Sequence, residues 1–84
     1  MRTIFEYEGH TIIFDRKFSS AHLIIDGITA DSCDGFIKSQ LSNFELNGKL
    51  NDGRSVRLQI KFRFPIDYAI LSIDGKPVIE KNAL

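Results

Sequence analysis

The chain is poor in the residues that support crosslinking and in the long apolar runs that cross membranes. Its 84 residues include one cysteine, Cys33, and no tryptophan. A single cysteine excludes an internal disulfide and is typical of a reducing compartment. No apolar run approaches the roughly 20 residues needed to span a bilayer. The N-terminus alternates polar and apolar residues and carries two glutamates, unlike a signal peptide. We therefore expect one cytoplasmic domain with no membrane contact.

An excess of charge of one sign is also missing. The chain has 11 basic and 11 acidic residues. Domains that bind nucleic acid usually carry excess positive charge, which displaces counterions from the phosphates. The balance therefore argues against a dedicated nucleic-acid binder, although it allows a local basic patch.

What the sequence does contain is the pattern of a β protein, most clearly in residues 54–64. Apolar residues occupy every second position of this segment: Val56, Leu58, Ile60, Phe62 and Phe64. The positions between them are polar: Ser55, Arg57, Gln59, Lys61 and Arg63. A helix cannot present such an alternation as one stripe. The pattern predicts a strand whose apolar face is buried.

The partner of this strand is residues 44–50, and the register between them determines the length of the loop. A two-residue loop would set Lys49 opposite Val56 and mix the two faces. A three-residue loop, residues 51–53, sets Leu46 opposite Leu58 and keeps the faces separate. Because a slip of one residue turns every side chain to the wrong face, we predict the second register. Gly53 then takes the left-handed conformation that such a loop requires.

Three further pairs of residues predict two-residue hairpin turns. They are Glu8-Gly9, Asp26-Gly27 and Asp74-Gly75, which join residues 2–7 to 10–15, 21–25 to 28–31, and 69–73 to 76–81. Pro77 lacks an amide donor and marks the last strand as an edge. Four aspartates stand at turns or strand ends, where we expect them to bond their own backbone: Asp15, Asp26, Asp52 and Asp74.

The chain also has a probable internal duplication. Residues 18–27 and 66–75 share Ala, Leu, Ile, Asp and Gly at the same positions. We therefore predict a single mainly-β domain over residues 1–84, built from two pseudo-repeated β-meanders at about 1–31 and 44–81. Seven to eight antiparallel strands would form a compact sandwich or a barrel. The link, residues 32–43, is open between a strand, which we favour, and a short helix beginning near Asp34.

The repeated Ile-Asp-Gly hairpin resembles hairpins in the β-sandwich family of the Fas apoptosis inhibitory molecule. The likeness covers this one turn motif in each half of the chain. It implies a β fold and nothing about activity.

No residue pattern points to catalysis, a metal or a cofactor. Cys33 stands between Asp31 and Asp34, whose charges would raise its pKa and suppress the thiolate. A two-residue turn at 26–27 would set His22 opposite Asp31, and we favour an exposed ion pair there over an acid–base pair. The donor residues show no metal-ligand spacing, and no glycine-rich phosphate loop is present. We expect a protein that is not an enzyme.

Two surfaces remain as binding candidates. The polar face of residues 54–64 carries Arg57, Lys61 and Arg63, with Lys49 on the neighbouring strand, and such a ribbon can hold a phosphate backbone. Glu45 interrupts this ribbon and no aromatic side chain is interleaved to stack bases, so we favour a solvated strand face.

The second surface is a pair of loops at equivalent places in the two halves, residues 16–20 and 64–68. They carry Phe18, Ile66 and Tyr68. We favour these side chains as plugs over the ends of the core; the alternative is an apolar contact patch.

The leading functional hypothesis is a non-catalytic module that binds another protein or itself. It would use a sheet edge such as residues 76–81, or the loop patch. Binding of nucleic acid or another anionic ligand on the basic strand face is the alternative.

Overall fold

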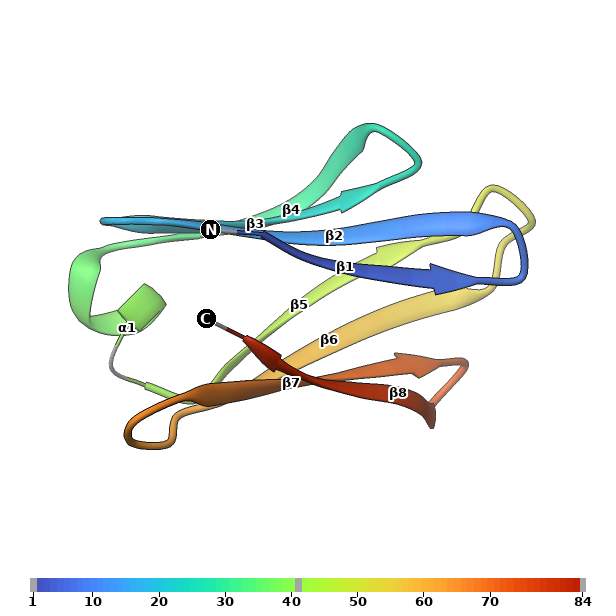
Figure 1. Ribbon diagram of the computed structural model, residues 1–84. Coiled ribbons are helices and arrows are strands. Elements are labelled where there is room, and N and C mark those ends of the chain that lie inside the picture. Colours follow the sequence, from blue (N-terminus) through green and yellow to red (C-terminus); the bar gives the residue numbers. More distant parts are fainter. Residues whose placement is uncertain (1, 41, 84) are drawn as a thin grey trace.

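Two four-stranded antiparallel sheets face each other in the computed structural model, which describes residues 2–40 and 42–83 (Figure 1). The first sheet has the order β1 (Arg2–Tyr7), β2 (His10–Lys17), β3 (Ser20–Ile25), β4 (Ile28–Asp34). The second has the order β5 (Phe44–Lys49), β6 (Ser55–Lys61), β7 (Asp67–Ile73), β8 (Lys76–Ala83). A short helix, α1 (Phe36–Gln40), lies between the sheets in sequence. The predicted mainly-β fold is confirmed, and a sandwich describes it. In the described residues, no helix has the length and apolarity needed to cross a membrane.

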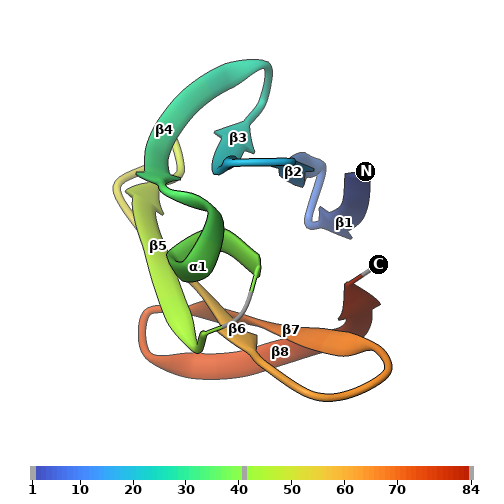
Figure 2. The same cartoon turned by 90° about the vertical axis from the view of Figure 1, so that its left-hand side faces the viewer.

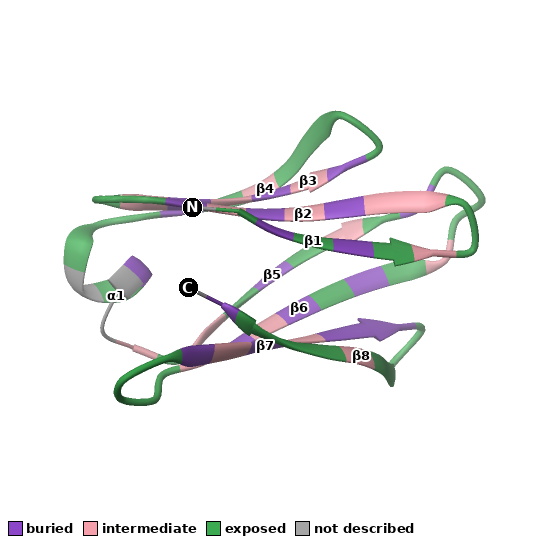
Figure 3. Ribbon diagram, viewed as in Figure 1, coloured by how far each residue is buried: buried purple, intermediate pink, exposed green. Residues whose placement is uncertain are grey.

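The core lies between the sheets. It consists of the side chains at every second position of the strands, which face inward (Figure 3). Its largest fully buried side chains come from both sheets: Phe5, Ile12, Phe14, Leu23, Leu46, Val56, Leu58, Ile60 and Leu71. Each strand therefore contributes one apolar face, as period-2 patterning requires.

The predicted registers of the β1–β2 and β5–β6 hairpins are confirmed. Leu46 lies opposite Leu58, and Phe5 lies opposite Ile12. The amide of Leu50 donates to the carbonyl of Arg54, which closes a three-residue loop with Gly53 at φ 93°. The last strand, β8, is an edge, as its proline indicated.

The two halves share irregularities as well as turns. The β3–β4 register shifts between Leu23 and Ile24, and the β7–β8 register shifts at the equivalent place, between Leu71 and Ser72. In the first half, Asp26 Oδ1 accepts a hydrogen bond from the amide of Thr11 at 2.8 Å. Asp74 and Ser55 repeat this bond in the second half, also at 2.8 Å. These matched features support two meanders of common design.

The bulge in β4 overturns one predicted contact. His22 lies opposite Ser32, and Asp31 lies opposite Leu23, so the expected His22–Asp31 pair does not form. The extra residue sets Cys33 opposite Ala21 in the core, where an unbroken register would have placed the hydroxyl of Ser32. The bulge therefore keeps the inward face apolar.

The strand predicted over residues 54–64 ends at Lys61, so the expectation that Phe62 and Phe64 are buried was wrong. The backbone leaves the sheet because its amides find other acceptors. The amide of Phe62 donates to Oδ1 of Asn43 at 2.6 Å, and the amide of Arg63 donates to Oδ1 of Asp67 at 3.0 Å.

The linking segment contains both of the predicted alternatives. Its first residues continue β4 to Asp34, but α1 follows, so our preference for a strand was wrong there. Gly35 directly precedes the helix, and its carbonyl accepts hydrogen bonds from the amide and hydroxyl of Ser39. Asp34 pairs with Ser20 in the sheet instead of capping the helix. Residue 41 of this segment lies outside the described residues.

Two side chains link the sheets along their open sides. Oδ2 of Asp31 on β4 accepts a hydrogen bond from the amide of Asn47 on β5 at 2.8 Å. On the other side, Nζ of Lys81 on β8 donates to the carbonyl of Ile4 on β1. Both links occupy backbone groups that an edge strand would otherwise offer to another chain.

The two sheets approach each other closely at Gly48 on β5. A Cβ at this position would lie 2.8 Å from Cβ of Ala30 and 2.8 Å from Cδ1 of Ile25. Such distances are well inside van der Waals contact, so β4 and β5 can approach only where a side chain is missing.

We predict that Gly48→Ala lowers the free energy of unfolding by about 2 kcal/mol, because the added methyl group overpacks this contact. Urea denaturation followed by circular dichroism measures the change. Glu45→Ala on the same strand is the control and should cost less than about 0.5 kcal/mol. Equal stability of the two variants would show that the sheets do not meet closely at Gly48.

Candidate functional site

Successive connections of a meander lie at opposite ends of its strands, and this rule sorts the loops of the protein into two groups (Figure 1). The four hairpin turns, residues 8–9, 26–27, 51–53 and 74–75, share one end, which we call the turn end. The other connections share the opposite end, which we call the aromatic end: residues 18–19 between β2 and β3, the α1 segment between β4 and β5, and residues 62–66 between β6 and β7. The two loops that the repeat made equivalent therefore do lie at one end.

The aromatic end exposes large apolar side chains. The exposed fractions are 79% for Phe18, 43% for Phe36, 43% for Phe62, 93% for Phe64 and 41% for Ile66. The rings of Phe18 and Phe36 contact each other, with centroids 5.0 Å apart. Figure 2 views this end directly, with α1 in front of the space between the sheets. Phe18 and Ile66 are exposed and do not cover the end of the core, so the prediction that they act as plugs was wrong.

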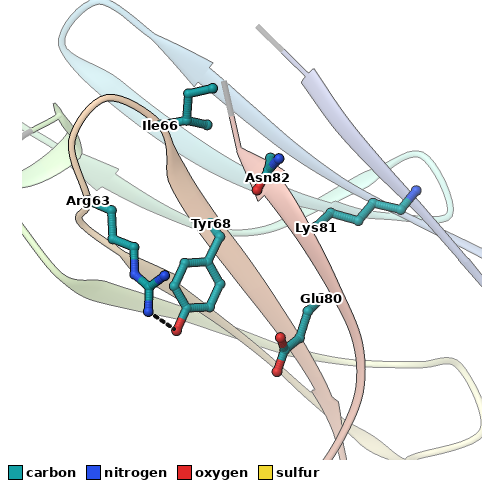
Figure 4. Close-up of a pocket in the computed structure, with 6 residues that line it drawn as sticks. All are labelled: Arg63, Ile66, Tyr68, Glu80, Lys81 and Asn82. Atoms are coloured by element: carbon teal, nitrogen blue, oxygen red, sulfur yellow. Dashed lines mark hydrogen bonds between the residues drawn. The ribbon is translucent and has the colours of Figure 1, made fainter.

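Tyr68 differs from its neighbours in the 64–68 loop because it is half-buried and belongs to β7. Its ring lies under the guanidinium of Arg63, 4.3 Å from the centroid, and its hydroxyl accepts from Arg63 at 3.4 Å. These two residues form one wall of a polar groove of about 380 Å³. Figure 4 shows its lining: Arg63, Ile66, Tyr68, Glu80, Lys81 and Asn82.

A buried ion pair supports the aromatic end from below. Nη1 of Arg16 on β2 lies 2.9 Å from Oδ2 of Asp67 on β7, and the two side chains are only 6% and 8% exposed. The same carboxylate accepts the amide of Arg63. The pair therefore joins the two sheets and also anchors the loop that carries Phe64. No local sequence pattern indicated this ion pair, because Arg16 and Asp67 lie far apart in sequence.

The predicted basic ribbon is only partly continuous. Lys49 and Arg57 lie on the exposed polar face of the β5–β6 pair, and Lys61 on the same face is half-buried. Arg57 lies 3.7 Å from Glu45, and Arg63 has left the strand to stack on Tyr68.

The two ends of the molecule differ in charge, although the net charge of the chain is zero. The aromatic end carries four basic residues, Lys17, Lys38, Lys61 and Arg63, against two exposed acidic residues, Asp34 and Glu45. The turn end carries five acidic residues against three basic ones. The acidic residues are Glu6, Glu8, Asp26, Asp52 and Asp74; the basic ones are Lys49, Arg54 and Lys76.

Contacts at the turn end lower the pKa of two of its carboxyl groups, Asp26 and Asp52. The hydrogen bond from His10, 2.7 Å away, and that from the amide of Thr11 lower the pKa of Asp26. Hydrogen bonds from Arg54 lower the pKa of Asp52 and hold its carboxylate in its own turn, as predicted.

The sequence predicted that Asp15, Asp26 and Asp74 would also bond the backbone of their own turns, and for these three the prediction was wrong. Asp26 and Asp74 each bond the amide of a neighbouring hairpin. Asp15 lies within β2, 3.8 Å from Arg2. The Asp-Gly turns form because both central residues adopt positive φ, as at Asp26 and Gly27, and not because of a local side-chain bond.

An apolar cleft lies at the turn end, between the β3–β4 hairpin and the start of the β5–β6 loop. Its volume is about 400 Å³. Its lining residues are Ile25, Asp26, Ile28, Ala30, Lys49 and Asn51. The floor belongs to the core, since Ile25 is 6% exposed, whereas Ile28 on the wall is 73% exposed.

The remaining candidates for chemistry have structural roles. Burial raises the pKa of the Cys33 thiol, and the charges of Asp34 and Asp31 add to this rise. Nε2 of His22 lies 3.2 Å from the hydroxyl of Ser20, and the residues opposite His22 are Ser32 on β4 and Asp15 on β2. Among residues 2–40 and 42–83, no group of three or more His, Cys, Asp or Glu could hold a metal ion.

Comparisons with known proteins add no relative to this picture. No family model matches the chain, and neither curated proteins nor solved structures include a significant match.

We predict that Asp67→Asn lowers the free energy of unfolding by about 3 kcal/mol, because it leaves the buried guanidinium of Arg16 facing a neutral partner. Urea denaturation measures the effect. The control, Asp15→Asn, disrupts the more exposed pair with Arg2 and should cost less than about 1 kcal/mol. Equal costs would contradict an anchoring role for Asp67.

We predict that Cys33 in the folded protein reacts with a maleimide about a hundredfold more slowly than in the urea-unfolded chain, because the thiol is both buried and protonated. Mass spectrometry of timed samples measures the rate. Rapid labelling under native conditions would instead show an accessible thiolate.

Proposed function

We propose that this protein is a non-catalytic, cytoplasmic interaction module that binds another protein, or a second copy of itself, through its aromatic end. The observation that carries the proposal is the exposure of Phe18, Phe36, Phe62, Phe64 and Ile66 at that end. Monomeric proteins rarely leave large apolar patches in contact with water, and such patches commonly mark binding surfaces. Aromatic anchors supply a large share of the binding energy at protein interfaces.

The construction of the aromatic end supports this function. The Arg16–Asp67 pair and the hydrogen bond from the amide of Arg63 hold the loop of Phe64 in place before binding. A side chain that is already held loses less conformational entropy when a partner covers it. The loop thus presents its aromatic residues on a rigid base.

The sheet edges are weaker candidates than the aromatic end. In β8, Pro77 lacks an amide donor and the bulge interrupts the ladder, so an added strand would pair poorly. Lys81 already occupies the carbonyl of Ile4 on β1, and Asp31 occupies the amide of Asn47 on β5.

A second candidate function is the binding of nucleic acid or another anionic ligand on the β5–β6 face. It is favoured by the shared orientation of Lys49, Arg57 and Lys61. It is weakened by Glu45, which neutralises part of that face, and by the absence of net charge. A salt titration against single-stranded DNA tests it. Affinity that survives the triple charge reversal Lys49→Glu, Arg57→Glu and Lys61→Glu would eliminate it.

We predict that the double variant Phe18→Ser, Phe64→Ser weakens association at least about tenfold while leaving the fold intact, because both side chains are mostly exposed. Sedimentation velocity over a range of protein concentrations measures self-association. Pull-downs with the tagged chain detect other partners, which are then titrated as purified proteins.

The matched control is Val78→Ser, which removes an exposed apolar side chain from β8. It should bind like the original protein. A chain that stays monomeric at every concentration and retains no partner would overturn the proposal, as would equal effects of the control and the double variant.

A further inference from the structure

The two ends of the sandwich are complementary in shape. Phe64 projects from the aromatic end and is 93% exposed, whereas the turn end holds an apolar cleft of about 400 Å³. We infer that the aromatic end of one molecule docks into the turn-end cleft of a second copy, with Phe64 as the inserted side chain. This inference rests on the proposed function and names its partner.

The cleft is suited to an apolar side chain. Ile25, Ile28 and Ala30 form its apolar surface, and its floor is continuous with the core. Its wall includes Ala30, the residue that the β4 bulge leaves unpaired, which lies close to Gly48 on β5. Filling it would remove from water the side chain of Ile28, which is 73% exposed.

The equivalent hairpin in the second half of the chain carries different side chains. At the place of Ile28, the β7–β8 hairpin carries Lys76, followed by Pro77. The two hairpins share their turn and bulge, but only the first has an apolar side chain at this position. The Ile28 hairpin is therefore the receptor, and the β8 hairpin serves as an internal control.

The charges of the two ends favour the same arrangement. The aromatic end has four basic residues and two exposed acidic residues, while acidic residues outnumber basic ones at the turn end. A head-to-tail contact brings these opposite charges together. A contact between two aromatic ends would instead set the same basic side chains, such as Lys38 and Arg63, against each other. Within the cleft itself Asp26 and Lys49 balance, so the contrast comes from the surrounding turns.

The geometry also determines the form of the assembly. The two ends lie at opposite extremes of an elongated molecule with extents of 33 × 20 × 18 Å. A contact between different surfaces leaves one free surface at each end of the pair, so further copies can add. We therefore expect short linear chains of molecules rather than a closed dimer.

Two variants, each blocking one surface, test the inference. Phe64→Ser removes the inserted side chain and leaves the cleft. Ile28→Lys places a cation in the cleft and leaves Phe64; its exposed position tolerates the change. Val78→Lys on the β8 hairpin is the matched control. Circular dichroism and urea denaturation verify that every variant is folded.

We expect the weight-average mass of the original protein in sedimentation velocity to rise with concentration past that of a dimer, and to fall when salt is added. Each blocked variant should be monomeric at the same concentrations, with association at least about tenfold weaker. An equimolar mixture of the two should form a dimer and nothing larger, because one intact surface of each kind remains. Val78→Lys should behave like the original protein.

Other outcomes separate this inference from the proposed function. A monomeric original protein, or a mixture that fails to form the dimer, would refute head-to-tail docking. If only Phe64→Ser abolished association, the aromatic ends would pair with each other: the inference would fail and the proposed function would stand. If both variants associated like the original protein, neither would hold.

Discussion

The structure depends on the burial of one face of each sheet against the other. Every second side chain in the strands points inward, and the register between neighbours keeps these side chains on one side. Two local irregularities, the bulge in β4 and the glycine in β5, also contribute to this burial. The bulge in β4 turns Cys33 inward in place of Ser32, and Gly48 lets β5 approach β4. The four edge strands are then joined in pairs by Asp31 and Lys81, so the sandwich is linked on both sides.

The meander topology that builds this core also separates the surfaces. The four turns with an Asp-Gly or Glu-Gly pair all lie at one end, where their carboxylates are held by amides and by Arg54. The connections at the other end contain no such pair; one of them, residues 18–19, is also a two-residue turn. That end carries the exposed phenylalanines and four of the 11 basic side chains. A chain of zero net charge thus becomes a molecule with two different ends.

The Arg16–Asp67 pair connects the core with the aromatic end. Two buried charges are costly unless each finds a partner, and here each meets the other across the space between the sheets. Asp67 also receives the amide of Arg63, so the ion pair that links the sheets also positions the loop with Phe64. The stability of the fold and the presentation of its aromatic surface are therefore coupled through one carboxylate.

The sequence by itself determined most of the strands, the Asp-Gly and Glu-Gly turns and the registers of the β1–β2 and β5–β6 hairpins, because period-2 alternation and left-handed Asp-Gly pairs are local signals. It also located Phe18 and Ile66 in equivalent loops. It did not determine that Phe62 and Phe64 are exposed. Their alternation continues that of Ile60, and only Asn43 and Asp67, brought close by the fold, draw the backbone out of the sheet.

The sequence also did not determine the bulge that separates His22 from Asp31. This bulge depends on the packing of Cys33 in the core. Nor did the sequence determine the ion pair, the apolar cleft or the opposite charges of the two ends. Each of these requires residues from both halves of the chain to meet. Local patterns determined how each segment is built, and the tertiary structure decided which segments share an end, because contacts between the sheets carry no local signal.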